Sequence, residues 1–323
     1  MRLKYLVDYS LWRPTPNKFW QISLVDLNLL FTSNQTPEFT DYLETLRLQG
    51  NNLGQSFNQS FVSTINATYT YTDDPYGQIK KGNYLRLSLE SGGTTLNLFP
   101  NNRIGFLSQI FGDTLQFFKF LRVNADYRKY ILIGNRNKSS FAYRINTGLA
   151  YSYGQGRNLP YEKNFFVGGP SSIRAWRPRT LGPGSDTTTI RLDKPGSILL
   201  EASAEYRFKI FRFLGDYYIN GAFFVDAGNV WRFDGQNTEG VTGSEFQFNR
   251  FYKEIAVGTG FGIRADLSFF VLRLDWALKV IDPSQDEGNR WVLFRDKSNF
   301  RGNAREGGFS NPLVLNFGIG YPF

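Results

Sequence analysis

The sequence contains no cysteine, no histidine and a single methionine. Without cysteine the chain can form no disulfide and offers no thiol nucleophile, and without histidine it lacks the commonest general base and zinc ligand. The missing cysteines suit a secreted or envelope protein that avoids stray oxidation. No nucleophile elbow, pocket motif or metal-ligand spacing is present. We therefore expect no enzymatic activity, no catalytic residue, no metal and no cofactor.

Long apolar runs are missing as well. No stretch of about 18 apolar residues occurs, which excludes a transmembrane helix. The first residues, MRLKY, lack the apolar segment of a signal peptide. The net charge is +9, but no nucleic-acid-binding motif accompanies it. Solubility alone explains such a balance, and we expect no nucleic acid partner.

Aromatic residues, by contrast, are abundant, since 31 Phe and 18 Tyr help to make up 17% aromatics. The mean hydropathy is nevertheless negative, at −0.34. A transmembrane β-barrel combines these two properties, because its lipid-facing and lumen-facing residues alternate and average out.

Alternation of apolar and polar residues predicts about eleven strands, and helical spacing predicts one short helix over 38–48. The predicted strands are 3–9, 17–31, 61–71, 84–98, 117–133, 141–153, 198–208, 218–231, 255–267, 272–280 and 313–323. Connections alternate between short ones (134–139, 210–217, 268–270) and long ones (154–197, 232–254, 281–311). This favours an all-β antiparallel transmembrane barrel over residues 1–323. A soluble β-sandwich is the alternative, and it would have shorter strands and no such asymmetry.

The loop 154–197 is the most unusual stretch, and its centre reads FFVGGPSSIRAWRPRTLGPG over 165–184. Glycine and proline exclude a regular strand or helix there. Loops longer than about 12–15 residues are usually functional or disordered. This one could be a mobile surface loop, or it could fold inward so that Arg174 meets a buried carboxylate.

The strands after this loop carry a charged face that would line the lumen of a barrel. Its members are Glu201, Glu205, Arg207, Asp226, Arg264, Asp266, Arg273 and Asp275. An inward-folded arginine would pair with the acidic residues, because its planar fork suits carboxylates. The alternative is that these charged side chains pair only with one another along the wall and keep the lumen hydrated. Gly258, Gly260 and Gly262 alternate on one face, which would allow a loop backbone to approach closely.

Five features carry a family resemblance. The sequence SIRAW, Ser172–Trp176, is similar to a loop motif [VI]-R-G-[FY], from which it departs at Ala175 and Trp176. The run FVDAGNVW begins at Phe224 and is similar to the strand that receives the loop arginine. The glycine row continues into Arg264 and Asp266, and five strands follow the loop. The chain then ends on a pattern similar to the terminal β-signal of outer-membrane proteins, made by Asn316, Gly318, Tyr321 and Phe323.

On these motifs the chain resembles the bacterial outer-membrane assembly-factor superfamily, the group of BamA, TamA and the two-partner secretion transporters. Two further stretches, LESGG and RPRTLGPGS, look most like its TamA-like lipoprotein branch. The resemblance implies a sixteen-stranded barrel preceded by POTRA domains. We expect this chain to be a C-terminal portion of such a barrel, without a POTRA domain; a shorter barrel completed by oligomerisation is the alternative.

The resemblance also implies a site and a function. The loop latch would be Ile173, Arg174, Ala175 and Trp176, and its acceptors Phe224, Asp226, Glu201 and Glu205. The close-approach wall would be Gly258, Gly260, Gly262, Arg264 and Asp266. We expect a non-enzymatic barrel in the bacterial outer membrane that inserts or translocates proteins. Its partners would be outer-membrane lipid, nascent outer-membrane protein clients and periplasmic or envelope assembly partners. A two-partner-secretion-type transporter, a passive porin and a surface carbohydrate-binding β-protein are the alternatives.

Overall fold

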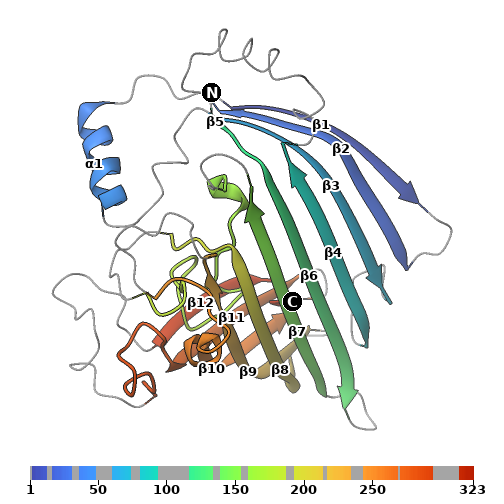
Figure 1. Ribbon diagram of the computed structural model, residues 1–323. Coiled ribbons are helices and arrows are strands. Elements are labelled where there is room, and N and C mark those ends of the chain that lie inside the picture. The colour runs from blue at the N-terminus through green and yellow to red at the C-terminus, as the bar shows by residue number, and fades with distance from the viewer. Residues whose placement is uncertain are drawn as a thin grey trace, which may run out of the picture.

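The computed structural model is dominated by one antiparallel sheet (Figure 1). It describes residues 2–12, 17–30, 36–48, 60–73, 81–93, 116–133, 139–153, 159–186, 193–213, 217–233, 243–267, 270–293 and 313–323. The strands are β1 (Arg2–Trp12), β2 (Lys18–Leu30), β3 (Ser60–Thr72), β4 (Gly82–Gly92), β5 (Gln116–Phe117), β6 (Phe120–Ile133), β7 (Ser139–Ser152), β8 (Ile198–Phe213), β9 (Tyr217–Trp231), β10 (Ala256–Asp266), β11 (Val271–Ile281) and β12 (Leu313–Ile319). One α-helix, α1 (Pro37–Leu48), and two 3₁₀ helices, Tyr161–Lys163 and Phe251–Glu254, complete the described elements.

The strands pair in chain order from β1 to β12, except that the two-residue β5 pairs in parallel with β3. The sheet is strongly curved, with β1 and β12 at its two ends (Figure 1). Within the described residues these end strands each pair with one neighbour and not with each other. The all-β antiparallel class is thereby confirmed, as an open sheet that fits part of a barrel.

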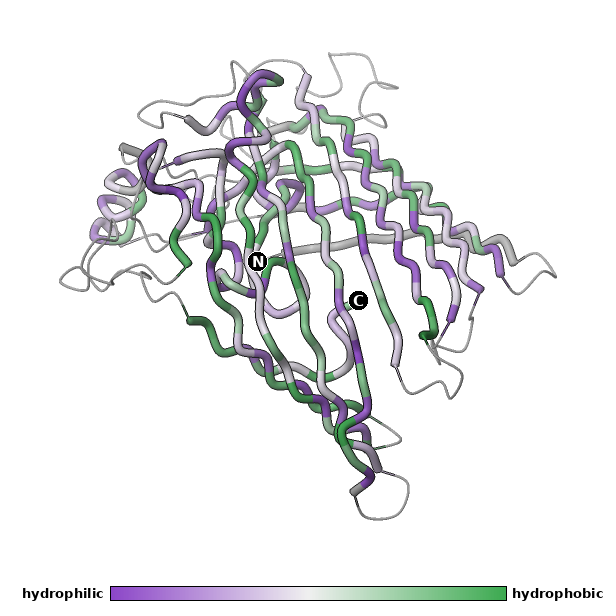
Figure 2. Tube along the Cα trace, turned by 90° about the horizontal axis from the view of Figure 1, so that it is seen from below, coloured by the Kyte–Doolittle hydropathy of each residue, from purple (hydrophilic) through white to green (hydrophobic). Residues whose placement is uncertain are grey.

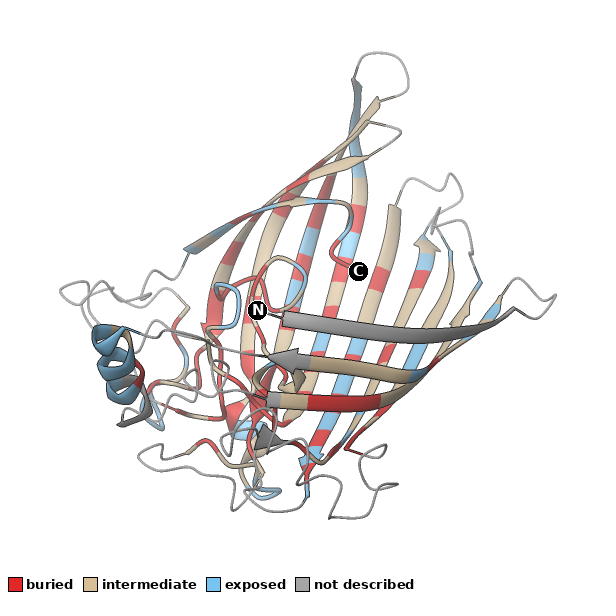
Figure 3. Ribbon diagram, turned by 90° about the horizontal axis from the view of Figure 1, so that it is seen from above, coloured by how far each residue is buried: buried red, intermediate tan, exposed pale blue. Residues whose placement is uncertain are grey.

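Side chains alternate between the two faces of each strand, as the sequence predicted. On β12 the outward residues Leu313, Leu315, Phe317 and Ile319 are exposed, whereas Asn316 between them is only 6% exposed. Figures 2 and 3 show the same alternation of hydropathy and burial along the other strands. The outer surface is therefore apolar, and polar and charged side chains are buried on the concave side.

The helix prediction is confirmed by α1. Thr36 caps it, because the Thr36 hydroxyl accepts the Phe39 N–H at 3.4 Å and Pro37 fits the first helical turn. No helix among the described residues is long and apolar enough to cross a membrane.

Three strand boundaries differ from the prediction. The strand predicted over 84–98 ends at Gly92 as β4, and residues 94–98 lie outside the described residues. Strand β8 runs on to Phe213, five residues beyond the predicted end at 208. The last strand stops at Ile319 instead of 323, because Gly320 adopts φ 84° and turns the chain off the sheet.

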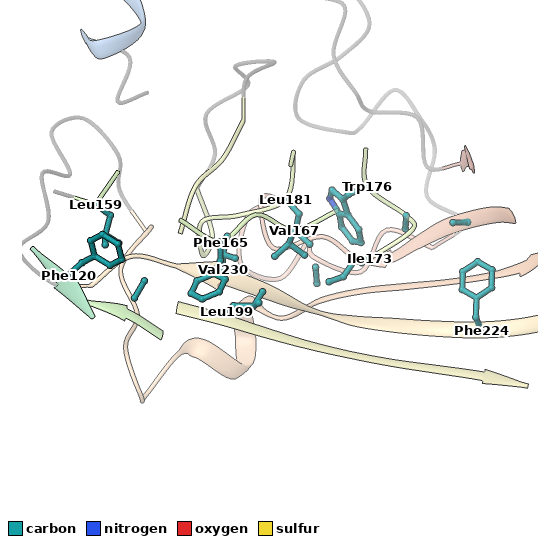
Figure 4. Packing of buried hydrophobic residues seen from close by; sticks show 14 of the residues in the cluster. Phe120, Leu159, Phe165, Val167, Ile173, Trp176, Leu181, Leu199, Phe224 and Val230 are labelled. Atoms are coloured by element: carbon teal, nitrogen blue, oxygen red, sulfur yellow. The ribbon is translucent and has the colours of Figure 1, made fainter. Parts of the chain in front are cut away.

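The central loop packs on the concave face of the sheet. Its residues Phe165, Val167, Ile173, Trp176 and Leu181 are all 5% exposed or less and join one apolar cluster (Figure 4). The same cluster includes wall residues of β8 and β9. The loop is therefore folded inward, which decides between the two alternatives that the sequence left open.

Candidate functional site

The loop reaches the wall through a tight double turn. Gly168 and Gly169 adopt φ of 104° and 100°, which residues with side chains rarely do. A Cβ on Gly168 would lie 2.3 Å from the Arg177 carbonyl oxygen. The Gly169 N–H donates to the Trp176 carbonyl at 2.8 Å, which closes the turn. Arg174 thus stands at the inner tip of a turn closed by a backbone hydrogen bond.

Arg174 makes a two-pronged contact with Asp226 on β9. Its Nε and Nη2 atoms donate to the two carboxylate oxygens, each at 2.8 Å, and its backbone N–H donates to Oδ2 at 3.1 Å. Its Nη1 donates to Glu205 Oε2 on β8 at 2.6 Å. The guanidinium carbon also lies 3.4 Å from the centre of the Phe224 ring, within cation–π range. The structure thereby brings three of the four predicted acceptors to the arginine.

Full burial makes this a strong ion pair. The side chains of Arg174 and Glu205 are 0% exposed, and that of Asp226 is 1% exposed. Burial alone would lower the pKa of Arg174, but the Asp226 and Glu205 carboxylates outweigh it and raise the pKa above its ordinary value. The arginine is therefore charged whenever the loop is docked.

The fourth predicted acceptor, Glu201, has different partners. It accepts the Ser172 hydroxyl and, at 2.8 Å, the Asn146 side-chain amide of β7. Glu201 therefore contacts the loop two residues before Arg174. Sequence reasoning had not singled out Ser172 or Asn146, although both are polar residues on inward positions.

The charges of the wall form a chain behind the loop. Glu205 also contacts Arg207 Nε at 2.8 Å and Arg264 Nη2 at 3.1 Å. Arg264 Nη1 lies 2.7 Å from Asp275 Oδ1, and Arg273 Nε lies 3.5 Å from Asp275 Oδ2. Asp266 is half-buried at the end of β10. Some wall charges thus pair along the wall and others pair with the loop arginine. Each of the two alternatives that the sequence left open therefore holds for part of the charged face.

The loop residues beside Arg174 fill the space in front of β10. Ile173 is 0% exposed, and Lys279 lies 4.9 Å from the centre of the Trp176 ring. A Cβ on Gly258 would lie 2.6 Å from the Ala175 methyl carbon, so Gly258 makes room for this alanine. Among the described residues Arg179 is the one non-glycine residue with positive φ, so Ala175 fits without strain.

The other two wall glycines differ from the expectation, because wall residues and not a loop backbone fill their space. Gly260 pairs with Phe224, and its Cβ would lie 2.1 Å from the Trp276 carbonyl oxygen of β11 and 2.4 Å from the Phe224 ring. Gly262 pairs with Asp275, and its Cβ would lie 1.9 Å from Arg264 Nη1. These glycines therefore make room for the charge network and its aromatic support.

The predicted terminal motif is split between the sheet and the lumen side. Asn316 on β12 donates its side-chain amide to the Arg174 carbonyl oxygen at 2.9 Å. Gly318 lies against Arg273, whose Nη2 would be 2.6 Å from an added Cβ. Tyr321 and Phe323, predicted to continue the outward face of the strand, instead follow the turn at Gly320, and Phe323 is buried.

A second set of contacts anchors the far end of the loop. Glu254, which is 1% exposed, accepts the Trp231 indole N–H at 2.7 Å and the Ser185 hydroxyl at 3.1 Å. The Asn229 side-chain amide donates to the carbonyl oxygens of Gly184 and Glu254. Sequence reasoning missed Glu254; the signal was a lone acid directly before a strand. Within the described residues, no group of three or more acidic residues could hold a metal ion.

Comparison with known proteins finds one matching family and one similar curated protein. A model of the Omp85 superfamily domain matches residues 8–323. The outer membrane protein assembly factor BamA of Neisseria meningitidis serogroup B is 31% identical over 105 residues, which are 31% of this chain and 13% of that protein.

Two solved structures share the fold. BamA from Haemophilus ducreyi lacking POTRA domains 1–3 matches with a TM-score of 0.59 and 14% identity, covering 99% of this chain and 54% of that chain. CdiB from Escherichia coli matches with a TM-score of 0.50 and 10% identity, covering 98% of this chain and 44% of that chain. The chain thus spans about half the length of these structures. Because the family model matches nearly the whole chain, the protein belongs to the Omp85 superfamily.

Proposed function

We propose that residues 1–323 form part of a non-enzymatic barrel that assembles, inserts or translocates outer-membrane proteins, with 154–197 as its regulatory loop. The observation that carries the proposal is the fully buried contact of Arg174 with Asp226 and Glu205. A buried pair of this kind holds a loop firmly, yet it can be broken in a single step. Breaking one side leaves a desolvated charge and costs about 3–5 kcal/mol.

The loop latch is connected to the last strand. The Asn316 amide of β12 donates to the carbonyl oxygen of Arg174 itself. A displacement of β12 therefore changes a contact of the latch residue, and release of the latch removes a tether from β12. This connection supports a mechanism in which the loop and the last strand move together.

The edge of β12 that faces away from β11 supplies the seam. With seven residues, β12 is shorter than its neighbour β11, which has eleven, and it stands at the end of the strand order. An extended client strand can pair with such an edge by β-augmentation. The clients would be nascent outer-membrane proteins, the apolar outer face would meet membrane lipid, and envelope assembly partners would bind elsewhere. The Neisseria relative is named an assembly factor, which supports this choice.

Site-specific crosslinking tests the seam. A photo-crosslinking residue at Leu315 on β12 should capture an unfolded outer-membrane protein, whereas the same residue at Val225 on β9 should not, although both side chains are outward and about half exposed. Equal capture at the two positions would show that the seam is not selective.

A transporter is the second candidate, because the fold is shared with CdiB. A transporter would differ from an assembly barrel in the protein that it carries and not in the architecture of the barrel wall. A large, steady single-channel conductance together with no client capture at Leu315 would favour a transporter or a passive porin.

A further inference from the structure

The last residues of the chain leave the sheet and cross its concave side. After β12 ends at Ile319, Gly320 turns the chain and its N–H donates to the Val271 carbonyl at 2.7 Å. The following residues, 320–323, are called the return segment here. Phe323 is 7% exposed and packs with Tyr130 of β6 and Ala142 of β7. Four strands separate β7 from β12 in the sheet, and Figures 1 and 3 show the C-terminus over these middle strands.

Arg207 of β8 holds the return segment in place. Its guanidinium carbon lies 4.4 Å from the centre of the Tyr321 ring, 5.6 Å from that of Phe323 and 5.9 Å from that of Tyr130. All three distances are within the cation–π range of about 6 Å. Its Nη2 also donates to the Phe323 carbonyl oxygen at 3.3 Å. The arginine is 8% exposed, so the three rings enclose most of it.

One carboxylate connects Arg207 to the loop latch. Glu205 accepts Arg207 Nε on its Oε1 at 2.8 Å and Arg174 Nη1 on its Oε2 at 2.6 Å. Oε1 thus contacts the arginine beside the return segment, and Oε2 contacts the loop arginine and, at 3.1 Å, Arg264 Nη2 of the wall. Any movement of Arg207 changes the orientation and the charge balance of the carboxylate that Arg174 needs.

We propose that the return segment is a displaceable strap whose docking strengthens the loop latch through Arg207 and Glu205. When Phe323 is seated, Arg207 is held against Glu205 Oε1 and the other oxygen faces Arg174. When the strap leaves, Arg207 loses its aromatic surroundings and its carbonyl acceptor, and the loop is held less firmly. The strap acts on the same loop as the proposed function, and therefore rests on it. Because coupling is reciprocal, release of the loop also weakens the strap.

Because the sequence contains no cysteine, a single introduced thiol can report the exposure of the loop without background labelling. Ser172→Cys places one near-isosteric thiol on the half-buried inner side of the loop. The rate at which a maleimide labels this thiol, in the folded protein in membrane fragments, reports loop release. In this background Phe323→Ala should raise the rate about five-fold or more, the lower end of usual allosteric coupling. Phe317→Ala is the control, because Phe317 is 65% exposed on the outer face of the same end region.

Equal labelling rates for the Phe323→Ala and Phe317→Ala proteins would overturn the strap. If Phe323→Ala prevents folding, Phe323→Leu keeps most of the buried volume and removes the ring, and it should still raise the rate. A double variant tests the route through Glu205. If the strap acts through Glu205, the labelling rate of the Glu205→Gln protein should not rise further when Phe323→Ala is added. If the two substitutions multiply each other's effect on the rate, that route is excluded. Labelling needs no client, so an unchanged Phe323→Ala rate beside normal client capture refutes the strap alone. A raised Phe323→Ala labelling rate without client capture at Leu315 refutes the proposed function alone.

Discussion

Replacing Arg174 by alanine is the most direct perturbation of the latch. The substitution removes three side-chain hydrogen bonds to carboxylates, two to Asp226 and one to Glu205, while the backbone N–H at position 174 can still donate to Asp226. Asp226 is then left buried without its cation, whereas Glu205 keeps Arg207 and Arg264. Such a loss costs about 3–5 kcal/mol. Since about 1.4 kcal/mol is a tenfold change, the docked loop should open about a hundred-fold to a few thousand-fold more often.

The loop should nevertheless stay docked in most molecules. Val167, Ile173 and Leu181 remain buried, and each contributes about 1.5–3 kcal/mol. Hydrogen exchange detects such rare opening. The Gly169 N–H, bonded to the Trp176 carbonyl, should exchange about a hundred-fold faster in the Arg174→Ala protein.

A second arginine of the same loop provides the control. Arg179 contacts Asp193 at 2.9 Å, but its side chain is 53% exposed, and such a pair contributes less than about 1 kcal/mol. Arg179→Ala should therefore leave exchange at Gly169 nearly unchanged. Equal exchange in the wild-type and Arg174→Ala proteins would refute the latch. Asp226→Ala added to Arg174→Ala should restore part of the protection, because no unpaired buried carboxylate remains.

Three further predictions follow from single contacts. Gly258→Val should loosen the loop, because even a Cβ there would lie 2.6 Å from the facing alanine methyl, and faster loop exchange would show it. Trp231→Phe removes the indole donor of the buried Glu254 and should lower the melting temperature by the equivalent of about 1–3 kcal/mol. Burial would raise the pKa of Asp282, but its lysine partner outweighs it and the pKa is lowered. The contribution of Asp282 to the free energy of unfolding is therefore present above the unfolded pKa of about 3.9 and is lost as the pH falls through the folded pKa. When the free energy of unfolding is measured against pH, the Asp282→Asn protein should lack this acid-dependent loss.

The sheet was predictable because its signal is local. Alternation with a period of two reveals both faces of a strand in the sequence itself. Eight of the eleven strands on the main path therefore agree with prediction to within three residues at each end, and β4, β8 and β12 differ by more at one end. The family resemblance and the outer-membrane location are confirmed for the same reason, since they rest on contiguous motifs. The assignment to the TamA-like branch stays a prediction.

The contents of the concave side were less predictable, because they depend on pairs distant in the sequence. The turn at Gly320 has a local cause, but the burial of Phe323 depends on Tyr130 and Arg207, each more than a hundred positions away. Likewise, the pairing of Gly260 with Phe224 decides what fills the space of that glycine. A strand pattern predicts that a side chain points inward, but it does not say which partner meets it.

The charge network is better explained by controlled release than by stability. Taking several charged groups out of water costs free energy that an apolar core would not, so buried ion pairs are weak evidence of stability. The loop already has apolar anchors in Val167, Ile173 and Leu181, which suffice for docking. What the charges add is dependence on geometry: Glu205 serves three arginines at once, so moving any one of them changes the hold on the others. A loop fixed only by apolar contacts would lack that dependence, and the coupling to the last strand that we propose requires it.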